Sequence, residues 1–202
     1  FVIGGAGFIG SHLVDKLIKL GYSVVVLDNL TTGKKENINF KAKFYLCDVR
    51  DDVIEKIFAI EKPSIVYHLA SQVSVPKSVE NPKLDLDINI NGLLNVLQAC
   101  VRNNVEKIVF SSSGGAIYGE AEEYPTTEEY FPVPVSPYAI TKFTAEKYLY
   151  FYFKQYGLNF SILRYSNVYG PRQDSAHESG VVTIFINRVL HDEEVKIFTY
   201  PG

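Results

Sequence analysis

The sequence GGAGFIG, residues 4–10, stands between a short apolar segment and a segment whose apolar residues recur one helical turn apart. Glycines at positions 4, 7 and 10 permit a tight turn, because glycine adopts φ angles that other residues avoid. The missing Cβ atoms let a pyrophosphate approach the backbone, and the start of the following helix offers it unpaired N–H donors. Alone, the pattern also fits a plain tight turn. Its place between a strand and a helix predicts a dinucleotide-binding turn.

Apolar runs rich in β-branched residues alternate with segments of helical period along the rest of the chain. Buried strands are expected over residues 1–3, 23–27, 43–47, 64–69, 107–111 and 160–164. Helices are expected over residues 9–20, after the acidic pair at 51–52, over 82–103 and over 137–156. The alternation predicts right-handed crossovers and hence an α/β fold of the Rossmann type, a doubly wound parallel sheet with helices on both faces.

The composition excludes several classes of protein. The chain has 202 residues, 47% hydrophobic and 21% charged, with a formal net charge of −3, as in globular proteins and unlike disordered or collagen-like ones. No apolar run approaches the ~20 residues that span a bilayer, and no signal peptide is recognisable, so we expect the cytosol and no membrane partner. The sequence has no Lys/Arg cluster, so we do not expect nucleic acid as a partner. Cys47 and Cys100 lack ligand-like spacing, so reduced core thiols are expected and no metal.

Two aspartates follow the second and third expected strands. Asp28 stands about twenty residues beyond the glycines, where a carboxylate can accept both ribose hydroxyls of an adenosine. A carboxylate there would repel a 2′-phosphate, which favours NAD over NADP; the alternative is a polar residue that merely ends a strand. Asp48 could accept from the adenine amino group or could cap the next helix, and both interpretations remain open at this point.

Tyr138 and Lys142 stand four residues apart near the start of an expected helix, so their side chains share one face. An ammonium beside a phenol favours tyrosinate, a base that can deprotonate a hydroxyl as hydride leaves its carbon. The SSSGG sequence at residues 111–115 follows a strand and supplies a hydroxyl for the same oxygen. Alternatively, Tyr138 and Lys142 are ordinary exposed residues of a surface helix. The serines could likewise belong to a plain Ser/Gly turn without a chemical role.

Together these residues resemble a known family, the extended short-chain dehydrogenase/reductases, and within it the UDP-glucose 4-epimerase type of nucleotide-sugar epimerase. The resembling motifs are ordered as in the family and spread over almost the whole chain. They are GGAGFIG (4–10), DNLTTG (28–33), CDVRD (47–51), YHLASQ (67–72), SSSGGAIYGE (111–120), SPYAITK (136–142) and LRYSNVYGPRQ (163–173).

The resemblance implies a role for individual residues. Tyr138 would be the catalytic base, Lys142 would hold the nicotinamide ribose, and Ser113 would hold the reacting sugar hydroxyl, with Ser112 as the alternative. The implied NAD-binding residues are Gly4, Gly7, Phe8, Ile9, Gly10, Asp28, Asn29, Gly33, Asp48, Val49, Leu69, Ala70, Ser71, Asn89, Tyr138, Lys142, Tyr165 and Val168. The implied substrate-binding residues are Ser112, Ser113, Tyr138, Asn167 and Val181.

The resemblance also implies an activity, the NAD-dependent interconversion of UDP-glucose and UDP-galactose at C4 through a 4-keto intermediate. A nucleotide-sugar dehydrogenase or reductase, or another epimerase of the family, is the alternative, followed by a non-catalytic NAD-binding sensor. Dehydration is disfavoured. The sugar 4,6-dehydratases of the same superfamily carry an Asp-Glu pair in the segment after the fifth strand, and this chain has no carboxylate there before Glu120. The resemblance implies a homodimer through helices 82–103 and 137–156, the second of which is aromatic around much of its circumference; a covering C-terminal lobe is the other explanation.

Residues 1–170 are expected to form the NAD-binding domain, and residues 171–202 the start of a substrate lobe, with segments 180–190 and 195–198. The first strand has only three residues before Gly4, and the last expected strand ends at Pro201. We therefore expect the chain to be a piece of a longer protein.

Overall fold

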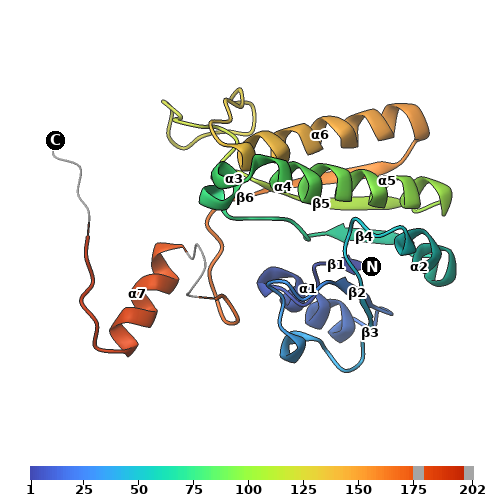
Figure 1. Cartoon of the computed structure of the whole chain (residues 1–202), viewed down its shortest axis with the longest axis horizontal. Helices are drawn as coiled ribbons and strands as arrows, with labels where there is room; N and C mark the ends of the chain where they lie inside the picture. The colour runs from blue at the N-terminus through green and yellow to red at the C-terminus, as the bar shows by residue number, and fades with distance from the viewer. Residues whose placement is uncertain (175–179, 198–202) are drawn as a thin grey trace. The chain divides into compact units, whose positions relative to one another are not determined.

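The computed structural model describes residues 1–174 and 180–197 (Figure 1). The chain divides into two compact units, Phe1–Ser166 and Asn167–Gly202. No helix among the described residues is long and apolar enough to cross a membrane.

The first unit is built on a parallel sheet. Its six strands lie in the order β3-β2-β1-β4-β5-β6, with every neighbouring pair parallel. The order reverses between β1 and β4, which is where doubly wound sheets bind ligands beyond the carboxyl ends of their strands. All six strands expected from the sequence are present: β1 (Val2–Ile3), β2 (Val25–Asp28), β3 (Lys43–Leu46), β4 (Ile65–His68), β5 (Lys107–Ser113) and β6 (Asn159–Tyr165).

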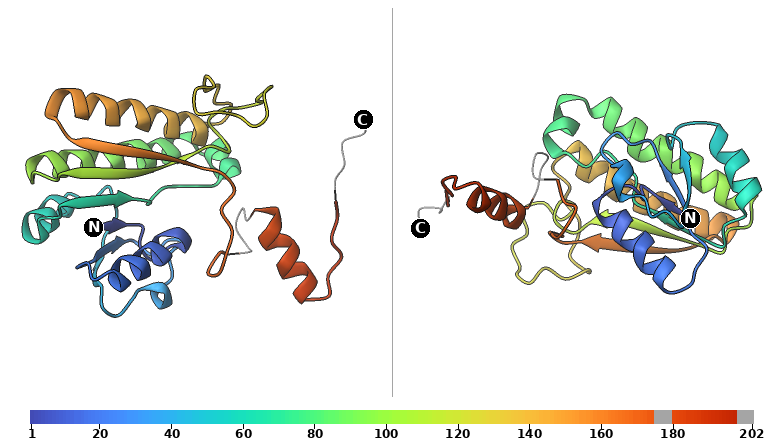
Figure 2. Two further views of the ribbon diagram at one scale, coloured as in Figure 1. Left: turned by 180° about the vertical axis from the view of Figure 1, so that it is seen from behind. Right: turned by 90° about the horizontal axis from the view of Figure 1, so that it is seen from below.

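The expected helices are present, and the structure adds a 3₁₀ turn at Lys35–Asn37. The expected helix at 82–103 contains a π-helical turn, η2, and a short helix that the sequence did not suggest, α3, precedes it. The helical elements are α1 (Phe8–Lys19), η1 (Lys35–Asn37), α2 (Val53–Glu61), α3 (Val75–Glu80), α4 (Pro82–Leu86), η2 (Asp87–Asn91), α5 (Gly92–Arg102), α6 (Pro137–Tyr156) and α7 (Val181–Leu190). Figure 2 shows α5 and α6 running side by side along one face of the sheet.

Side-chain caps set where three of these helices begin. Ser74, Asn81 and Ser136 accept from backbone N–H groups of the first turns of α3, α4 and α6, and a proline follows each cap within two residues. Proline suits this place because its missing N–H would have no partner there. The cap at Ser136 positions the first turn of α6, which carries Tyr138.

Each face of the sheet has its own apolar core. The larger core joins α2, α5 and α6 to the sheet and contains Phe58, Leu97, Phe110 and Leu149, each at most 2% exposed. The smaller core joins α1 to the opposite face through Val14 and Val26. Cys47 and Cys100 are buried and free, and both belong to the larger core.

The second unit contains α7, which begins within the segment 180–190 expected for a substrate lobe. Thr183 in its first turn hydrogen-bonds Gln173, which precedes the helix in the same unit. The structure forms no strand over residues 193–197, so the expected strand is absent there. Its remaining residues, through Pro201, lie outside the described residues.

Candidate functional site

The glycine turn packs between the ends of two strands. Gly4 has a φ of 83°, and its N–H donates to the carbonyl of Leu27 at 2.8 Å. A Cβ on Gly4 would lie 2.6 Å from the backbone nitrogen of Ala70, and one on Gly10 would lie 2.1 Å from the carbonyl oxygen of Gly4. The packing of the chain itself therefore requires glycine at both positions.

Gly7 differs from the other two glycines of the pattern. Its φ of −75° is open to any residue, and a Cβ there would approach only the carbonyl oxygen of Gly4, at an ordinary 3.4 Å. Gly7 is also the N-cap residue of α1, and no side chain caps that helix. The space at Gly7 thus lies beside free N–H groups, as close approach by a phosphate requires.

Asp28, the last residue of β2, is nearly buried and holds the turn in place. One carboxylate oxygen accepts from the N–H of Ala6 at 2.9 Å, and the other accepts from the N–H of Leu30 at 2.8 Å. A Cβ on Gly33 would lie 2.8 Å from the same carboxylate, so a larger residue there would displace the side chain of Asp28. Each oxygen retains acceptor capacity for a ligand hydroxyl, so Asp28 can both stabilise the turn and bind a ribose.

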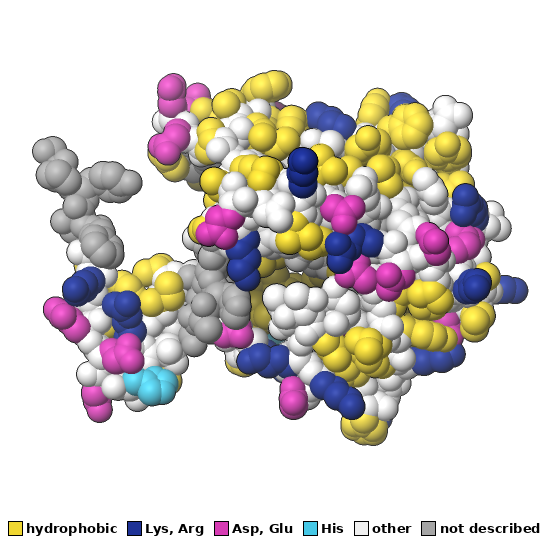
Figure 3. Space-filling model, viewed as in Figure 1, with side chains coloured by type: hydrophobic (Ala, Val, Ile, Leu, Met, Phe, Trp, Pro, Cys, Tyr) yellow, Lys and Arg dark blue, Asp and Glu magenta, His cyan; other side chains and the backbone are white. Residues whose placement is uncertain are grey.

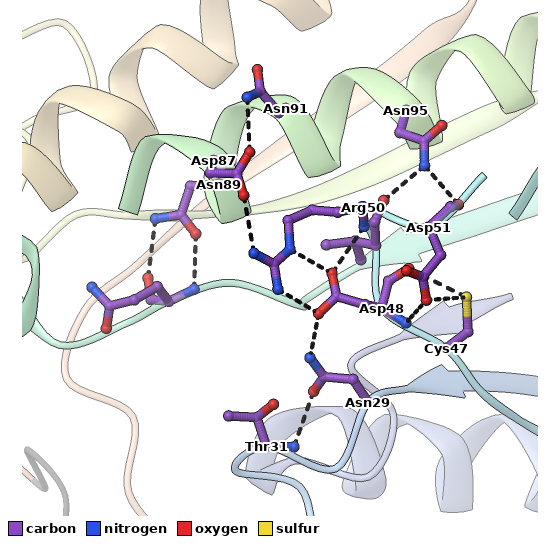
Figure 4. A network of polar contacts seen from close by, with 12 residues as sticks. Asn29, Thr31, Cys47, Asp48, Arg50, Asp51, Asp87, Asn89, Asn91 and Asn95 are labelled. Atoms are coloured by element: carbon purple, nitrogen blue, oxygen red, sulfur yellow. Dashed lines mark hydrogen bonds and ion pairs between the residues drawn. The ribbon is translucent and has the colours of Figure 1, made fainter. Parts of the chain in front are cut away.

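Asp48 forms a dense polar network after β3 (Figure 4). Its carboxylate accepts from the backbone N–H and Nε of Arg50 at 2.9 and 2.8 Å, from Nη2 of Arg50 at 2.9 Å, and from the amide of Asn29 at 2.8 Å. These contacts, above all those with Arg50, hold the pKa of Asp48 well below its usual range. The capping interpretation is wrong, because α2 begins at Val53 and its N-cap residue is Asp52. The adenine contact stays a prediction.

Arg50 extends this network to η2. Its guanidinium lies 3.0 Å from the carboxylate of Asp87, in the π-helical turn that also carries Asn89. The side chain of Asn89 accepts from the N–H of Gln72 at 2.8 Å and donates to the carbonyl of Gln72 at 3.1 Å. Asn89 therefore fixes the loop after β4, which begins with Leu69, Ala70 and Ser71.

Ser71 in that loop has an unusual hydroxyl. Its Oγ atom is buried, yet it has no hydrogen-bond partner among the residues that the structure describes. A buried polar atom without a partner is costly and indicates a missing ligand or water. This hydroxyl lies in the segment after β4, next to Ala70, whose backbone nitrogen approaches Gly4.

At the other end of the sheet, α6 brings Tyr138 and Lys142 together. Lys142 is only 4% exposed, so the interpretation of an exposed helix lysine is wrong. Its ammonium donates to the carbonyl of Ser111 at 2.9 Å and lies 5.7 Å from the centre of the Tyr138 ring. Burial lowers the pKa of Lys142 to about 8. The backbone N–H of Tyr138 donates to the hydroxyl of Ser78 at 3.1 Å, which ties the start of α6 to α3.

The structure distinguishes the two candidate serines. Ser112 is buried, and its hydroxyl donates to Oε1 of Glu146 at 2.6 Å. Glu146 also pairs with Arg164 at 2.7 Å. Ser113, the last residue of β5, is partly exposed and lies opposite Tyr165 in the register of β5 and β6. Ser113 is thus the serine whose hydroxyl is not committed to this ion pair.

The remaining candidates differ in how the structure places them. Phe8 and Ile9 are half-buried in the first turn of α1, and Val49 is buried against Gly92. Asn167, Val168 and Val181 belong to the second unit, so their roles stay predictions. Sequence reasoning missed a set of polar residues that hold the site together. They are Arg50, Asp85, Thr141, Glu146 and Arg164. A signal was present for Glu146, which stands four residues after Lys142 and so on the same face of the helix.

These features define a class of protein. The domain is a dinucleotide-binding domain of the short-chain dehydrogenase/reductase kind. It has the parallel sheet of this strand order, a glycine turn after β1, an acidic residue at the end of β2 and a Tyr–Lys pair on α6. Residues 1–200 match the family described as the NAD dependent epimerase/dehydratase family, and the chain belongs to that family.

Several relatives share nearly all of this chain. A putative UDP-glucose 4-epimerase of Methanocaldococcus jannaschii is 49% identical over 197 residues, which cover 98% of this chain and 65% of that protein. The structure of UDP-glucose 4-epimerase with UDP-glucose from Thermotoga maritima superposes with a TM-score of 0.95 at 52% identity, over 98% of this chain and 65% of that one. The UDP-glucose 4-epimerase of Thermus thermophilus in complex with NAD has a TM-score of 0.92 at 52% identity, over 96% and 63%. The chain thus spans just under two thirds of these relatives.

Proposed function

We propose that this chain is the NAD-binding part of an epimerase that inverts C4 of a nucleotide sugar, with UDP-glucose and UDP-galactose as the substrate pair. The observation that carries the proposal is the buried ammonium of Lys142 beside Tyr138, at the carboxyl end of a strand that terminates in Ser113. The names of the relatives support the choice of reaction and of substrate. The proposal assigns NAD binding to residues 1–170 and the start of a substrate lobe to residues 171–202.

The residues present fit NAD. Gly7 leaves room for a pyrophosphate at an uncapped helix start, Asp28 offers carboxylate oxygens to a ribose, and Ser71 has a buried hydroxyl that lacks a partner among the described residues. When bound, NAD supplies the capacity to take up a hydride from the sugar and return it. Asn29, Gly33, Asp48, Val49, Asn89 and Tyr165 would complete the cofactor groove, with Val168 from the second unit.

The chemical step falls to three side chains. Tyr138 would remove the proton of the C4 hydroxyl, and the positive charge of Lys142 would favour the tyrosinate that does so. Ser113 would donate to the same sugar oxygen and hold it during proton transfer. The 4-keto sugar would turn while its diphosphate stays anchored by Asn167 and its nucleotide by Val181, so remote binding energy retains the intermediate.

Turnover without added cofactor tests the proposal. The purified enzyme that contains this chain should convert UDP-galactose to UDP-glucose with no NAD in the assay, because the cofactor is regenerated in every cycle. Tyr138→Phe should abolish turnover while NAD remains bound. Net accumulation of NADH would indicate a dehydrogenase instead, and bound NAD without turnover of any nucleotide sugar would indicate a sensor.

We also propose that the protein forms a homodimer through the segments 82–103 and 137–156. Apolar side chains remain exposed on α6, and Figure 3 shows hydrophobic side chains at the surface over this helix; Ile140, Tyr150 and Phe151 are 50%, 55% and 49% exposed. Burying such a face would stabilise a pair of copies. Light scattering at micromolar concentration should give twice the monomer mass, and a monomer peak would contradict the dimer. The cytosol remains the proposed compartment, in keeping with the two buried thiols.

A further inference from the structure

Asp85 in α4 is a fully buried carboxylate, with 0% of its surface exposed. It accepts from the hydroxyl of Thr141 at 2.7 Å, from the amide of Gln72 at 2.9 Å and from the amide of Asn89 at 3.1 Å. Burying a carboxylate is costly unless hydrogen bonds and opposite charge offset the loss of water. Asp85 has the hydrogen bonds, so its burial also calls for a nearby positive charge.

The three partners of Asp85 come from three different segments of the chain. Each partner is a residue of the proposed site or the sequence neighbour of one. Gln72 follows Ser71 in the loop after β4, and Asn89 lies in η2. Thr141 directly precedes Lys142 on α6. The amide of Asn89 also lies 3.2 Å from the hydroxyl of Thr141, which closes the network. Asp85 therefore joins the cofactor side of the site to the helix that carries its chemistry.

Lys142 is the nearby cation, and the charges around it are few. His68 of β4 faces it, but burial lowers the pKa of His68 to about 3 and leaves it neutral. Tyr138 faces it from α6, while β5 contributes the carbonyl of Ser111 and the ring of Phe110. The carboxylate that acts on this ammonium is Asp85, which accepts from the hydroxyl of Thr141, the residue directly before Lys142.

Asp85 and desolvation act on Lys142 in opposite directions. Burial disfavours the ammonium, whereas the negative charge of Asp85 raises the pKa of Lys142. Glu146, one turn further along α6, is already paired with Arg164 at 2.7 Å. The buried charges of Asp85 and Lys142 thus offset each other through space, without a direct ion pair, and the ammonium stays available to donate to Ser111.

We propose that Asp85 is a positioning residue that holds the Lys142 turn of α6 and supplies the buried negative charge that keeps Lys142 protonated. The catalytic consequence rests on the proposed function, in which the ammonium of Lys142 favours the tyrosinate of Tyr138. The electrostatic part concerns residues of this chain alone.

Two nearly isosteric variants separate charge from hydrogen bonding. In Asp85→Asn, the remaining oxygen can still accept from Gln72 and Asn89, and the new amide can donate to Thr141. The hydroxyl of Thr141 can then donate to the carbonyl of Tyr138, which lies 3.0 Å away. Asp85→Asn therefore removes the charge and keeps the network, whereas Thr141→Val removes one hydrogen bond and keeps the charge.

The first measurement is the titration of Lys142 in the purified protein by NMR of ¹³Cε-labelled lysine, with the signal assigned by its loss in Lys142→Arg. We expect Asp85→Asn to lower the apparent pKa of Lys142 by about one unit. Thr141→Val should not lower it, and neither should the exposed control Glu80→Gln. An unchanged titration in Asp85→Asn would overturn the proposal, and so would an equal drop in Thr141→Val.

The second measurement is turnover at pH 8. A pKa near 7 in place of about 8 reduces the protonated fraction of Lys142 from about one half to about one tenth, so kcat should fall about fivefold in Asp85→Asn with KM nearly unchanged. A loss in KM alone would contradict the role assigned to Asp85. Absence of turnover in the unmodified protein, together with the expected NMR shift, would refute the proposed function and leave the assignment of Asp85 intact.

Discussion

The hydroxyl of Ser112 donates to Oε1 of Glu146 at 2.6 Å, in a buried cluster that also contains Arg164. This bond gives Ser112 a structural role and distinguishes it from Ser113, the serine that the resemblance favours for the sugar hydroxyl. Ser112 ties β5 to α6, and Arg164 extends the same cluster to the loop beyond β5 through the hydroxyl of Tyr118 at 2.8 Å and the carbonyl of Glu128 at 3.1 Å.

The two serines should respond differently to truncation. Ser113→Ala should lower kcat about a hundredfold with little change in stability, because it removes the proposed hydrogen bond to the reacting sugar oxygen. Ser112→Ala should retain most activity but lower the free energy of unfolding by about 1–3 kcal/mol, since a buried carboxylate oxygen loses a partner. Steady-state kinetics and urea unfolding of both variants check this. The reverse pattern would assign the sugar contact to Ser112.

The glycine turn gives a second matched pair. Gly10→Ala should destabilise the fold by about 2 kcal/mol or more, because its Cβ would lie 2.1 Å from a backbone oxygen of Gly4. Gly7→Ala should fold normally, since a Cβ there meets only one atom at 3.4 Å, and yet should bind NAD at least about tenfold more weakly. Thermal unfolding and calorimetric titration with NAD measure the two effects. Unimpaired NAD binding in Gly7→Ala would remove Gly7 from the cofactor site.

His68 should make the fold sensitive to acid. The folded-state pKa of His68 is about 3, below the ordinary value of 6.5. Between pH 6.5 and pH 3, His68 is therefore protonated in the unfolded chain and neutral in the folded chain. The contribution to stability is complete above pH 6.5 and is lost progressively as the pH falls towards 3, at up to about 1.4 kcal/mol per unit. His68→Leu should flatten the fall in the free energy of unfolding between pH 6.5 and 4.5. An identical slope in both proteins would show that His68 does not resist protonation.

Arg50 should govern the adenosine end of the proposed cofactor site. Its guanidinium bridges Asp48 and Asp87 and so joins the loop after β3 to η2. Arg50→Ala should weaken NAD binding about tenfold while lowering stability by only about 1 kcal/mol, because the pairs are partly exposed. The control is Lys43→Ala, which breaks another exposed ion pair, with Glu61. Equal NAD affinity in the two variants would show that the Arg50 bridge is structural only.

The backbone plan was predictable from the sequence because its signals are local. Apolar runs rich in β-branched residues predicted all six strands, and 3.6-residue periodicity predicted the longer helices, including α6 over Pro137–Tyr156. The short helix α3 was missed, since six residues carry too little periodicity to distinguish a helix from a loop. The π-helical turn was missed because its i→i+5 hydrogen bonds are a feature of backbone geometry with no residue pattern of their own.

The sequence by itself determined the parallel α/β fold, the glycine turn and the Tyr138–Lys142 pair, because each depends on residues a few positions apart. The tertiary structure decided which partners the polar side chains take. Ser112 meets Glu146 across 34 residues, and Asp85 meets Thr141 across 56. Such contacts exist only once the order of the strands and the packing of α4 against α6 bring distant segments together. Burial then turns these contacts into strong interactions, because low exposure removes the water that would otherwise compete for the same charges.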